Sequence, residues 1–397
     1  MATSVPKGYL LAGVHSRIKR DPHKQDLTLV MSETPASAAG VYTKNLVFAA
    51  PVALDRSRTP SDRIRAVAIC SGVANACTGE RGLRDAEEMA RLAALACGAE
   101  PDQALVLSTG VIGAFLPMDK VAQGIAAAAV KLGRSESSLI AAARGMLTTD
   151  TIHKLAGRIV TIGGRDIQVT GMAKGAAMMG PNMATMLALI LTDAALSPAA
   201  AQAALSAATN DSFNCMSVDG HMSTNDTVLL LANGAAGGEL LAGKDLAAFQ
   251  AALDEVCVEL AKAIAGDGEG ATHLVTIEIN GCASREAALE LAKTVANSPL
   301  VMTALHGADP NWGRIVSAAG YANVPFDPNG VTLRLNGFLL YQKGAPVAFD
   351  GQAVSTSIRD NRDTLIQLDF SEGTASRRFW TADLTAEYVR LNADYHT

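Results

Sequence analysis

Hydrophobic and polar positions along the chain follow two different periods, which predicts helices packed in layers on sheets. Short runs rich in Val, Ile and Leu are typical of strands, and apolar residues three and four apart indicate helices. In residues 82–97, for example, the pattern predicts a helix with Leu83, Met89 and Leu95 facing the core and Asp85 facing solvent. The alternation of strand-like and helix-like segments continues to the C-terminal region, and it indicates the α/β class.

The expected elements can be given as ranges. The helical segments are 82–97, 118–132, 197–208 and 245–264, the last being the longest amphipathic stretch. The strand segments are 27–31, 39–52, 64–69, 104–107, 186–191, 228–232, 273–279, 301–305, 331–335 and 365–370.

Composition narrows the class of protein further. The chain has 397 residues, 49% of them hydrophobic and 18% charged, which excludes a disordered protein. Its 33 basic and 39 acidic residues give a net charge of −6, which argues against a nucleic-acid partner. The longest dense apolar run, 183–191, is shorter than the about twenty residues that a bilayer requires, so no membrane association is expected.

Cysteine and histidine usage predicts neither disulfides nor a metal. The six cysteines form no CxxC pair and are expected to be small buried hydrophobic residues in a reducing compartment. The seven histidines are scattered without metal-ligand spacing. The N-terminal residues lack a signal-peptide pattern. These features predict a cytoplasmic protein without a metal centre.

The segment 171–194, GMAKGAAMMGPNMATMLALILTDA, has two readings. It is either a flexible glycine- and methionine-rich loop that leads into a buried strand, or the site of an N-terminal nucleophile. In the second reading the Thr185 hydroxyl attacks the carbonyl of Ala184, the peptide bond between them breaks, and the freed α-amine activates the same hydroxyl.

Several polar segments have the same ambiguity between turn and site. In VLSTGVIG, residues 106–113, Thr109 and Gly110 are either part of a turn or donors to an oxyanion. Four further clusters of Asp, Asn, Thr and Gly are each typical of a structured turn. Together they make a composite active site plausible; they are SGVANACTG (71–79), DGHMSTNDT (219–227), DGEGAT (267–272) and HGADPNWGR (306–314).

The stretch KGAAMMGPNMATML resembles the self-cleavage signature of the ornithine acetyltransferase family, also known as bifunctional glutamate N-acetyltransferase/ornithine acetyltransferase of arginine biosynthesis. The resemblance covers essentially the whole chain, from PKGYLLAGV at residues 6–14 to NADYHT at 392–397. The chain departs from the usual pattern at Cys70 and Val73 and at His221 and Met222.

The resemblance implies a self-cleaving enzyme with a four-layer αββα fold like that of the DmpA-type aminopeptidases. Cleavage between Ala184 and Thr185 would give an α chain of residues 1–184 and a β chain of 185–397, assembled as α2β2 or higher. The enzyme would transfer acetyl from N-acetylornithine to glutamate without a resident cofactor. Whether acetyl-CoA is a second acetyl donor stays open. The resemblance makes Thr185 the nucleophile and Thr109 and Gly110 the oxyanion hole, and its substrate contacts are Thr148, Lys174, Thr185, Glu269, Asn392 and Thr397.

These implied roles are chemically consistent. Lys174 can hold a substrate carboxylate or lower the pKa of a neighbouring ammonium, and Glu269 can pair with the ornithine side-chain ammonium. Two alternatives stay open from the sequence. One is an aminopeptidase or amidase on the same scaffold, in which water resolves the acyl-enzyme, and the other is a binding protein that keeps the fold without cleaving.

Overall fold

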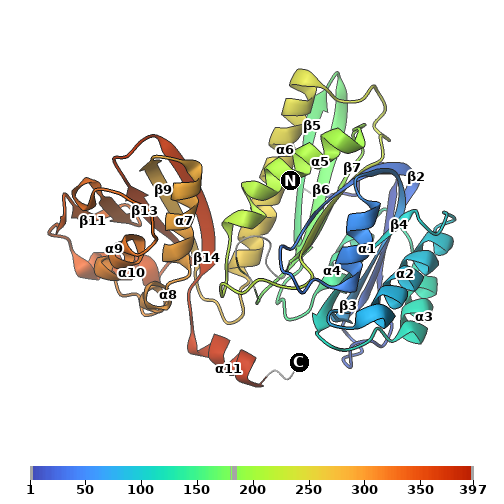
Figure 1. Cartoon of the computed structure of the whole chain (residues 1–397), viewed down its shortest axis with the longest axis horizontal. Coiled ribbons are helices and arrows are strands. Elements are labelled where there is room, and N and C mark those ends of the chain that lie inside the picture. Colours follow the sequence, from blue (N-terminus) through green and yellow to red (C-terminus); the bar gives the residue numbers. More distant parts are fainter. Residues whose placement is uncertain (1–2, 179, 181–185, 395–397) are drawn as a thin grey trace.

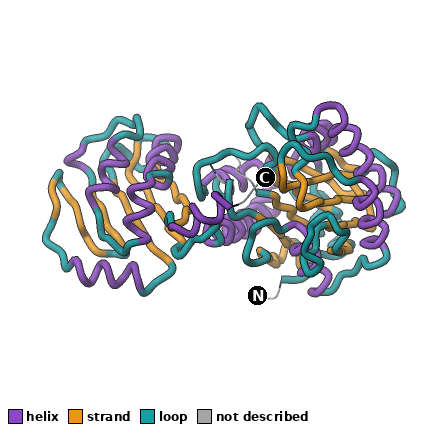
Figure 2. Tube along the Cα trace, turned by 90° about the horizontal axis from the view of Figure 1, so that it is seen from below, coloured by secondary structure: helices purple, strands orange, loops and turns teal. Residues whose placement is uncertain are grey.

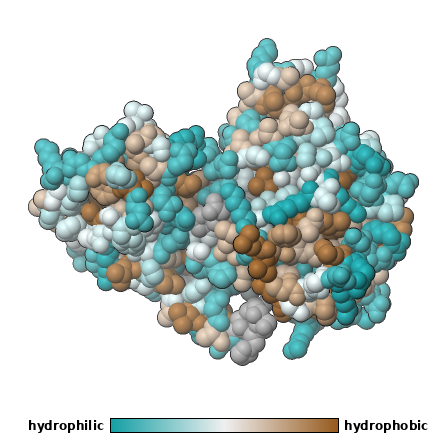
Figure 3. Space-filling model, viewed as in Figure 1, coloured by the Kyte–Doolittle hydropathy of each residue, from teal (hydrophilic) through white to brown (hydrophobic). Residues whose placement is uncertain are grey.

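The computed structural model describes residues 3–178, 180 and 186–394, and its described part contains two β-sheets with helices packed on them (Figure 1). The α/β class expected from the sequence is therefore confirmed. The tube view in Figure 2 shows two lobes, each built around one of the sheets. The face shown in Figure 3 is a mixture of hydrophilic and apolar residues, with hydrophilic residues over most of it.

The larger sheet has eight strands in the order β4-β3-β2-β8-β7-β6-β5, with β1 paired to β2 beside this path. Its strands are β1 (Tyr9–Val14), β2 (Leu27–Tyr42), β3 (Ser61–Val73), β4 (Ala104–Val111), β5 (Lys154–Ile162), β6 (Arg165–Lys174), β7 (Leu187–Thr192) and β8 (Thr227–Ala232).

The long strand β2 divides this sheet into two halves. Residues 27–32 of β2 pair with β1, residues 37–42 pair with β8, and the pairing with β3 is irregular between Met31 and Ala38. Irregularities of this kind bend a strand. One strand thus belongs to both halves. The first half contains β1, β3 and β4, and the second half contains β5, β6, β7 and β8.

Three hydrophobic clusters define the layers. The outer face of the first half packs on α2 (Gly79–Ala96) and α3 (Met118–Ala129). The inner cluster joins side chains of β3 and β4 to those of β7 and β8, together with α4 (Glu136–Met146). The outer face of the second half packs on α5 (Pro198–Asn210) and α6 (Gly243–Gly266). The order helix, sheet, sheet, helix is the expected αββα arrangement.

Burial on both faces explains why strand β7 is apolar from Leu187 to Leu191. Leu187, Leu189 and Leu191 face the inner cluster, while Ala188 and Ile190 face the cluster shared with α5 and α6. Both faces are buried, so the strand has no polar side, as is usual for strands covered on both faces.

The smaller sheet forms the second lobe, at the left of Figure 1. Its strand order is β12-β11-β10-β13-β9-β14, and Val275, Ile277 and Ile279 of β9 contribute to its core. The strands are β9 (Leu274–Cys282), β10 (Thr332–Leu335), β11 (Phe338–Gln342), β12 (Ala345–Pro346), β13 (Asp363–Asp369) and β14 (Ala375–Ala382). The helices of this part are α7 (Arg285–Ala296), α8 (Pro299–His306), α9 (Trp312–Gly320) and α10 (Gly351–Arg359), and α11 (Ala386–Asp394) follows β14.

Three expectations from the sequence were wrong. Residues 301–305 form part of α8, not a strand; the buried positions Val301, Met302, Ala304 and Leu305 have helical spacing, and Pro299 is suited to the first helical turn. The expected strand 39–52 ends at Tyr42, and its last residues belong to α1 (Ala50–Arg58), where Pro51 fits the first helical turn.

The third correction concerns which side chains are buried. Helix α2 buries Met89 and most of its alanines, whereas Leu83 and Leu95 are 43% and 51% exposed. Five cysteines are buried as expected, but Cys77 is exposed. None of the helices in the described part of the chain combines the length and apolar character needed to span a bilayer.

Candidate active site

Six residues singled out from the sequence line one cavity of about 330 Å³. They come from β4, from the loop after α4, from β6, from the loop after α6 and from α11, and they are Thr109, Gly110, Thr148, Lys174, Glu269 and Asn392. The other three, Ala184, Thr185 and Thr397, lie outside the described residues. The fold therefore brings together side chains that are up to 283 positions apart in the sequence, from 109 to 392.

The described residues on either side of 181–185 both lie against the segment 219–226. Before the gap, the Met178 amide donates to Asp219 Oδ2 at 2.6 Å, and a Cβ at Gly180 would lie 2.5 Å from the Gly220 carbonyl carbon. After the gap, the Met186 amide donates to Asp226 Oδ1 at 3.0 Å. The same segment contributes five residues to the cavity lining: Asp219, His221, Ser223, Thr224 and Asn225. The chain thus enters and leaves the expected cleavage segment beside the cavity.

Asp226 is fully buried, and burial raises the pKa of its carboxyl well above the usual range, against the opposing effects of the Met186 amide and the Lys174 ammonium. Its Oδ2 has no hydrogen-bond partner among the described residues. A buried carboxyl of this kind next to the start of β7 was not singled out individually from the sequence.

The end of β4 is held rigidly at the cavity. Gly110 has φ +130°, and a Cβ there would lie 2.2 Å from the Gly72 carbonyl carbon, so only glycine fits. The Asn225 side-chain amide donates to the carbonyls of Ala74 (2.6 Å) and Ser108 (2.8 Å) and so cross-links the ends of β3 and β4. Thr109, which is 2% exposed, is thereby fixed at the cavity wall.

Lys174 belongs to a buried group of charges. Its Nζ donates to Thr148 Oγ1 at 3.0 Å, and burial lowers the pKa of the ammonium, although Asp150 opposes the shift. Lys154 Nζ donates to Asp150 Oδ1 at 2.7 Å and to Asp267 Oδ2 at 2.6 Å. Burial acts to raise the pKa of Asp150, but the charges of Lys154 and Lys174 outweigh it and lower that pKa to about 2. Two lysines and two carboxylates thus share one buried network under the cavity.

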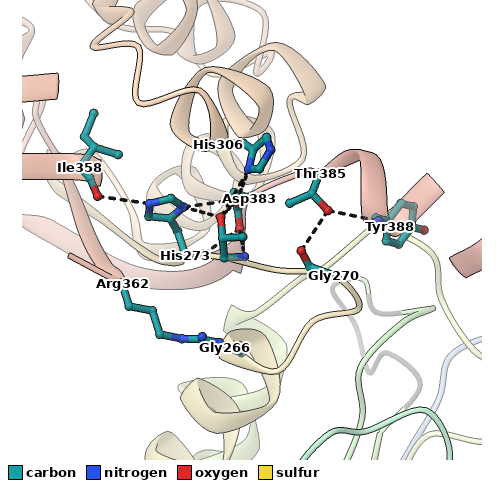
Figure 4. A network of polar contacts seen from close by, with 10 residues as sticks. Gly266, Gly270, His273, His306, Ile358, Arg362, Asp383, Thr385 and Tyr388 are labelled. Carbon is teal, nitrogen blue, oxygen red and sulfur yellow. Dashed lines mark hydrogen bonds and ion pairs between the residues drawn. The ribbon is translucent and has the colours of Figure 1, made fainter. Parts of the chain in front are cut away.

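The loop after α6 and helix α11 line the cavity with Glu269, Tyr388 and Asn392. Asp383 accepts hydrogen bonds from the amides of Thr272 and His273, both at 2.8 Å, and Thr385 Oγ1 donates to the Gly270 carbonyl (Figure 4). These bonds tie the loop after α6 to the start of α11.

Two further hydrogen bonds connect the loop after α6, helix α11 and the segment 219–226 at the cavity. Asn392 Nδ2 donates to Glu269 Oε2 at 2.9 Å, and the Tyr388 hydroxyl donates to Asp219 Oδ2 at 3.1 Å. Glu269 and Asn392, expected from the sequence to contact the substrate, are therefore direct neighbours. The Tyr388 hydroxyl has its pKa raised above the usual range, first by burial and then by Asp219.

The polar clusters differ in what they contribute. Cluster 219–227 supplies five lining residues, 267–272 supplies Glu269 and 71–79 supplies Ala74. Cluster 306–314 does not line the cavity; His306 Nδ1 instead lies 3.1 Å from Asp383 Oδ2. The departure at His221 falls on the cavity wall, whereas Cys70 is buried in the core. Tyr388 was missed because the sequence around it shows no polar cluster.

No group of three or more His, Cys, Asp or Glu side chains is placed to hold a metal ion in the described part of the chain. The polar groups that line the cavity are hydroxyls, amides, carboxylates, the Lys174 ammonium and the His221 imidazole. They can stabilise an oxyanion and bind a zwitterionic substrate.

Replacing Asp150 by Asn is expected to destabilise the protein by about 3–5 kcal/mol at neutral pH, because buried lysines lose a charged partner. The lowered pKa of Asp150 means that its stabilisation is complete above its ordinary pKa of 3.8 and is lost as the pH falls toward about 2. The difference between variant and wild type should therefore shrink over this interval. Urea unfolding at a series of pH values measures it.

The matched control for this prediction is Asp102→Asn. Asp102 pairs with Arg63 at the surface, where its side chain is 60% exposed. Such pairs contribute about 0–1 kcal/mol. Equal stability losses in the two variants would show that the buried network does not stabilise the fold.

The αββα layers, and the cavity lined by the large sheet, the loop after α6 and α11, define an α/β protein with an enzyme-like site. Comparison with known proteins identifies the group: the model of the ArgJ family matches residues 10–397. The chain is 46% identical over 397 residues to the arginine biosynthesis bifunctional protein ArgJ of Symbiobacterium thermophilum, covering 99% of this chain and 98% of that protein. It is 44% identical over 396 residues to the protein of the same name from Rhodopirellula baltica, covering 99% and 96%. This chain belongs to the ArgJ family.

A solved structure shares part of the fold. The crystal structure of arginine biosynthesis bifunctional protein ArgJ from Bacillus halodurans superposes with a TM-score of 0.51 at 38% sequence identity. The match covers 98% of that chain but 52% of this one. The solved chain is therefore about half as long as the one described here.

Proposed function

We propose that this protein transfers an acetyl group from N-acetylornithine to glutamate in arginine biosynthesis, through an acetyl group held on Thr185. Membership of the ArgJ family supports this activity. The observation that carries the proposal is the convergence of six expected site residues on one cavity, with Met186, which follows the proposed nucleophile, tied to a segment that lines it.

The proposed reaction begins with self-cleavage. The Thr185 hydroxyl attacks the Ala184 carbonyl carbon, and breakage of the peptide bond frees the Thr185 α-amine and leaves the Ala184 acyl group as an ester on the Thr185 oxygen. Water then hydrolyses this ester, which restores the Thr185 hydroxyl and leaves Ala184 with a C-terminal carboxylate. The freed α-amine accepts the hydroxyl proton when the oxygen attacks the acetyl carbonyl of N-acetylornithine. The Thr109 hydroxyl and the Gly110 amide stabilise the oxyanion, and ornithine leaves with a proton on its α-nitrogen. The glutamate α-amine then attacks acetyl-Thr185, giving N-acetylglutamate and restoring the hydroxyl.

The proposed α chain, 1–184, and β chain, 185–397, are not separate folding units. Strand β6 of the first pairs antiparallel with β7 of the second over six residue pairs, from Val169–Thr192 to Lys174–Leu187. Cleavage would therefore leave both chains in one sheet. A solved relative about half the length of this chain is compatible with division near the middle.

Substrate binding uses the charges of the cavity. We assign Lys174 and Thr148 to a substrate carboxylate, and Glu269 with Asn392 to the side-chain ammonium of ornithine. Thr397 completes the contact set in this proposal. No resident cofactor is required, because the acetyl group arrives on a substrate.

The proposal includes three finer points. Acetyl-CoA is a candidate second acetyl donor, in keeping with the word bifunctional in the names of the relatives. The enzyme works in the cytoplasm, and it assembles from at least two α and two β chains.

Kinetics test the proposed order of steps. A covalent acetyl-enzyme requires ping-pong behaviour, so double-reciprocal plots at several glutamate concentrations should give parallel lines. Intersecting lines would indicate direct transfer in a ternary complex.

A second assay separates a transferase from a hydrolase on the same scaffold. Release of ornithine from N-acetylornithine should depend on glutamate, and N-acetylglutamate should form in equal amount. Rapid ornithine release without glutamate, accompanied by free acetate, would instead identify an amidase.

A further inference from the structure

A second cavity adjoins the proposed active site. Its volume is about 780 Å³, compared with about 330 Å³ for the first. Four residues line both cavities: Gly110, Thr148, Thr149 and Glu269. One of the proposed oxyanion donors therefore stands at the boundary, and a substrate at the reaction centre can extend into either space.

The second cavity has a basic wall. Lys19, Arg20 and Lys24 line it, together with the carboxylates of Asp21 and of the shared residue Glu269. In the first cavity the carboxylates of Asp219 and Glu269 face one lysine, Lys174. The two spaces thus differ in the sign of the charge that they offer to a ligand.

The loop that carries the basic residues is built into the protein. Asp26, which is fully buried, accepts hydrogen bonds from the amides of Ser16 (2.6 Å), Ile18 (2.9 Å) and Lys19 (2.9 Å). The ammonium of Lys19 donates to the carbonyl of Leu147 at 2.6 Å, directly before Thr148 of the shared wall. These bonds hold the cationic loop against the reaction centre.

The two substrates of the proposed reaction create a conflict that this arrangement resolves. N-acetylornithine and glutamate must both bring their α-nitrogen to the same acyl carbon. Their side chains end in opposite charges, an ammonium in one and a carboxylate in the other. A site that pairs Glu269 with the ornithine ammonium would repel the glutamate side chain if it pointed the same way.

We propose that the basic cavity is the subsite that receives the side-chain carboxylate of glutamate, with Arg20 and Lys24 as its specificity-determining residues. This inference rests on the proposed function. The donor side chain points toward Glu269 and Asn392, the acceptor side chain points toward the basic loop, and both α-nitrogens meet at Gly110. Selection between the two amino acids is then made by side-chain charge and not by two separate reaction centres.

The test is the double variant Arg20→Gln/Lys24→Gln, in which two exposed side chains lose their charge. KM for glutamate should rise by about 3- to 10-fold with little change in kcat, as expected for two partly screened ion pairs. Exchange of labelled ornithine into N-acetylornithine, which needs no glutamate, should keep its rate. The preference for glutamate over glutamine, its uncharged isostere, should fall.

The matched control is Lys131→Gln/Lys343→Gln, which removes the same charge from exposed lysines that line neither cavity. This control should leave KM for glutamate unchanged at fixed ionic strength. In the wild type, KM for glutamate should increase with salt, whereas in the Arg20/Lys24 variant the salt dependence should be weaker.

Several outcomes would overturn the inference. The first is an unchanged KM for glutamate in the Arg20/Lys24 variant, and the second is an equal loss of ornithine exchange. The third is an effect confined to acetylation by acetyl-CoA, which would assign the basic wall to the phosphates of that donor. Failure of the proposed function gives a different result, because wild-type enzyme would then show no ornithine exchange, or would release free acetate without forming N-acetylglutamate. Intact ornithine exchange with an unchanged KM for glutamate in the Arg20/Lys24 variant would refute the glutamate subsite and leave the proposed function standing.

Discussion

Replacing Thr185 by alanine is expected to leave the protein as a single chain of 41.0 kDa and to abolish acetyl transfer. In the proposed mechanism one oxygen atom performs both reactions, first on the Ala184 carbonyl and then on the acetyl group. No neighbouring hydroxyl can substitute, because the general base is the α-amine of the same residue and it appears only after cleavage.

A denaturing gel with intact-mass measurement tests this prediction. Wild type should give two fragments that separate only under denaturing conditions, since β6 and β7 hold them in one sheet. Thr185→Ser should restore cleavage at least in part, because it keeps a hydroxyl at the same position.

Thr192→Ala is the matched control. This threonine is the last residue of β7 (Leu187–Thr192) and is fully buried, so the variant tests the loss of a buried hydroxyl away from the proposed cleavage point. It should be cleaved and active. Two fragments from Thr185→Ala would move the cleavage point to another residue and remove Thr185 from the mechanism.

The fold was predictable from the sequence where burial decides the pattern. Strands such as β7 and β8 are buried on both faces, and their uninterrupted apolar runs identified them. Residues 301–305 show the limit of this reasoning, because five apolar and small residues fit a strand or a helix equally well. Packing of α8 against α7 and α9 decides the matter, and packing is not visible in a local pattern.

Alanine-rich helices were the second source of error. In α2 the sequence offers both a leucine face and an alanine face, and hydrophobicity alone favours the leucines. The structure buries Ala86, Ala90 and Ala93 instead. Small side chains allow the helix to approach the sheet closely, so close contact outweighs the larger area of leucine.

Parts of the candidate site were visible as polar segments at the ends of strands. The cluster 219–227 and the STG of β4 were singled out in this way, and both line the cavity. The pairing of Tyr388 with Asp219 could not be predicted, because it joins positions 169 residues apart. The same holds for Lys154 and Asp267, whose buried ion pair spans 113 residues.

Replacing Thr109 by alanine is expected to lower kcat by about 10²- to 10³-fold with little change in KM. The proposed role of its hydroxyl is to donate to the oxyanion that forms in both half-reactions, and this interaction is made in the transition state and not in the bound substrate. The surroundings favour such a role. Gly110 is locked against Gly72, and Asn225 ties the end of β4 to that of β3, so the donor is fixed before substrate binds.

Steady-state kinetics of the Thr109→Ala and Thr109→Ser variants measure this effect. The serine variant keeps a hydroxyl and should recover most of kcat, whereas a purely structural role would make both variants lose stability and activity together. Thermal unfolding of each variant separates these cases. The Gly110 amide remains in the alanine variant, so some activity should persist and self-cleavage should slow without stopping. A normal kcat in Thr109→Ala would show that the end of β4 is an ordinary turn and that another group stabilises the oxyanion.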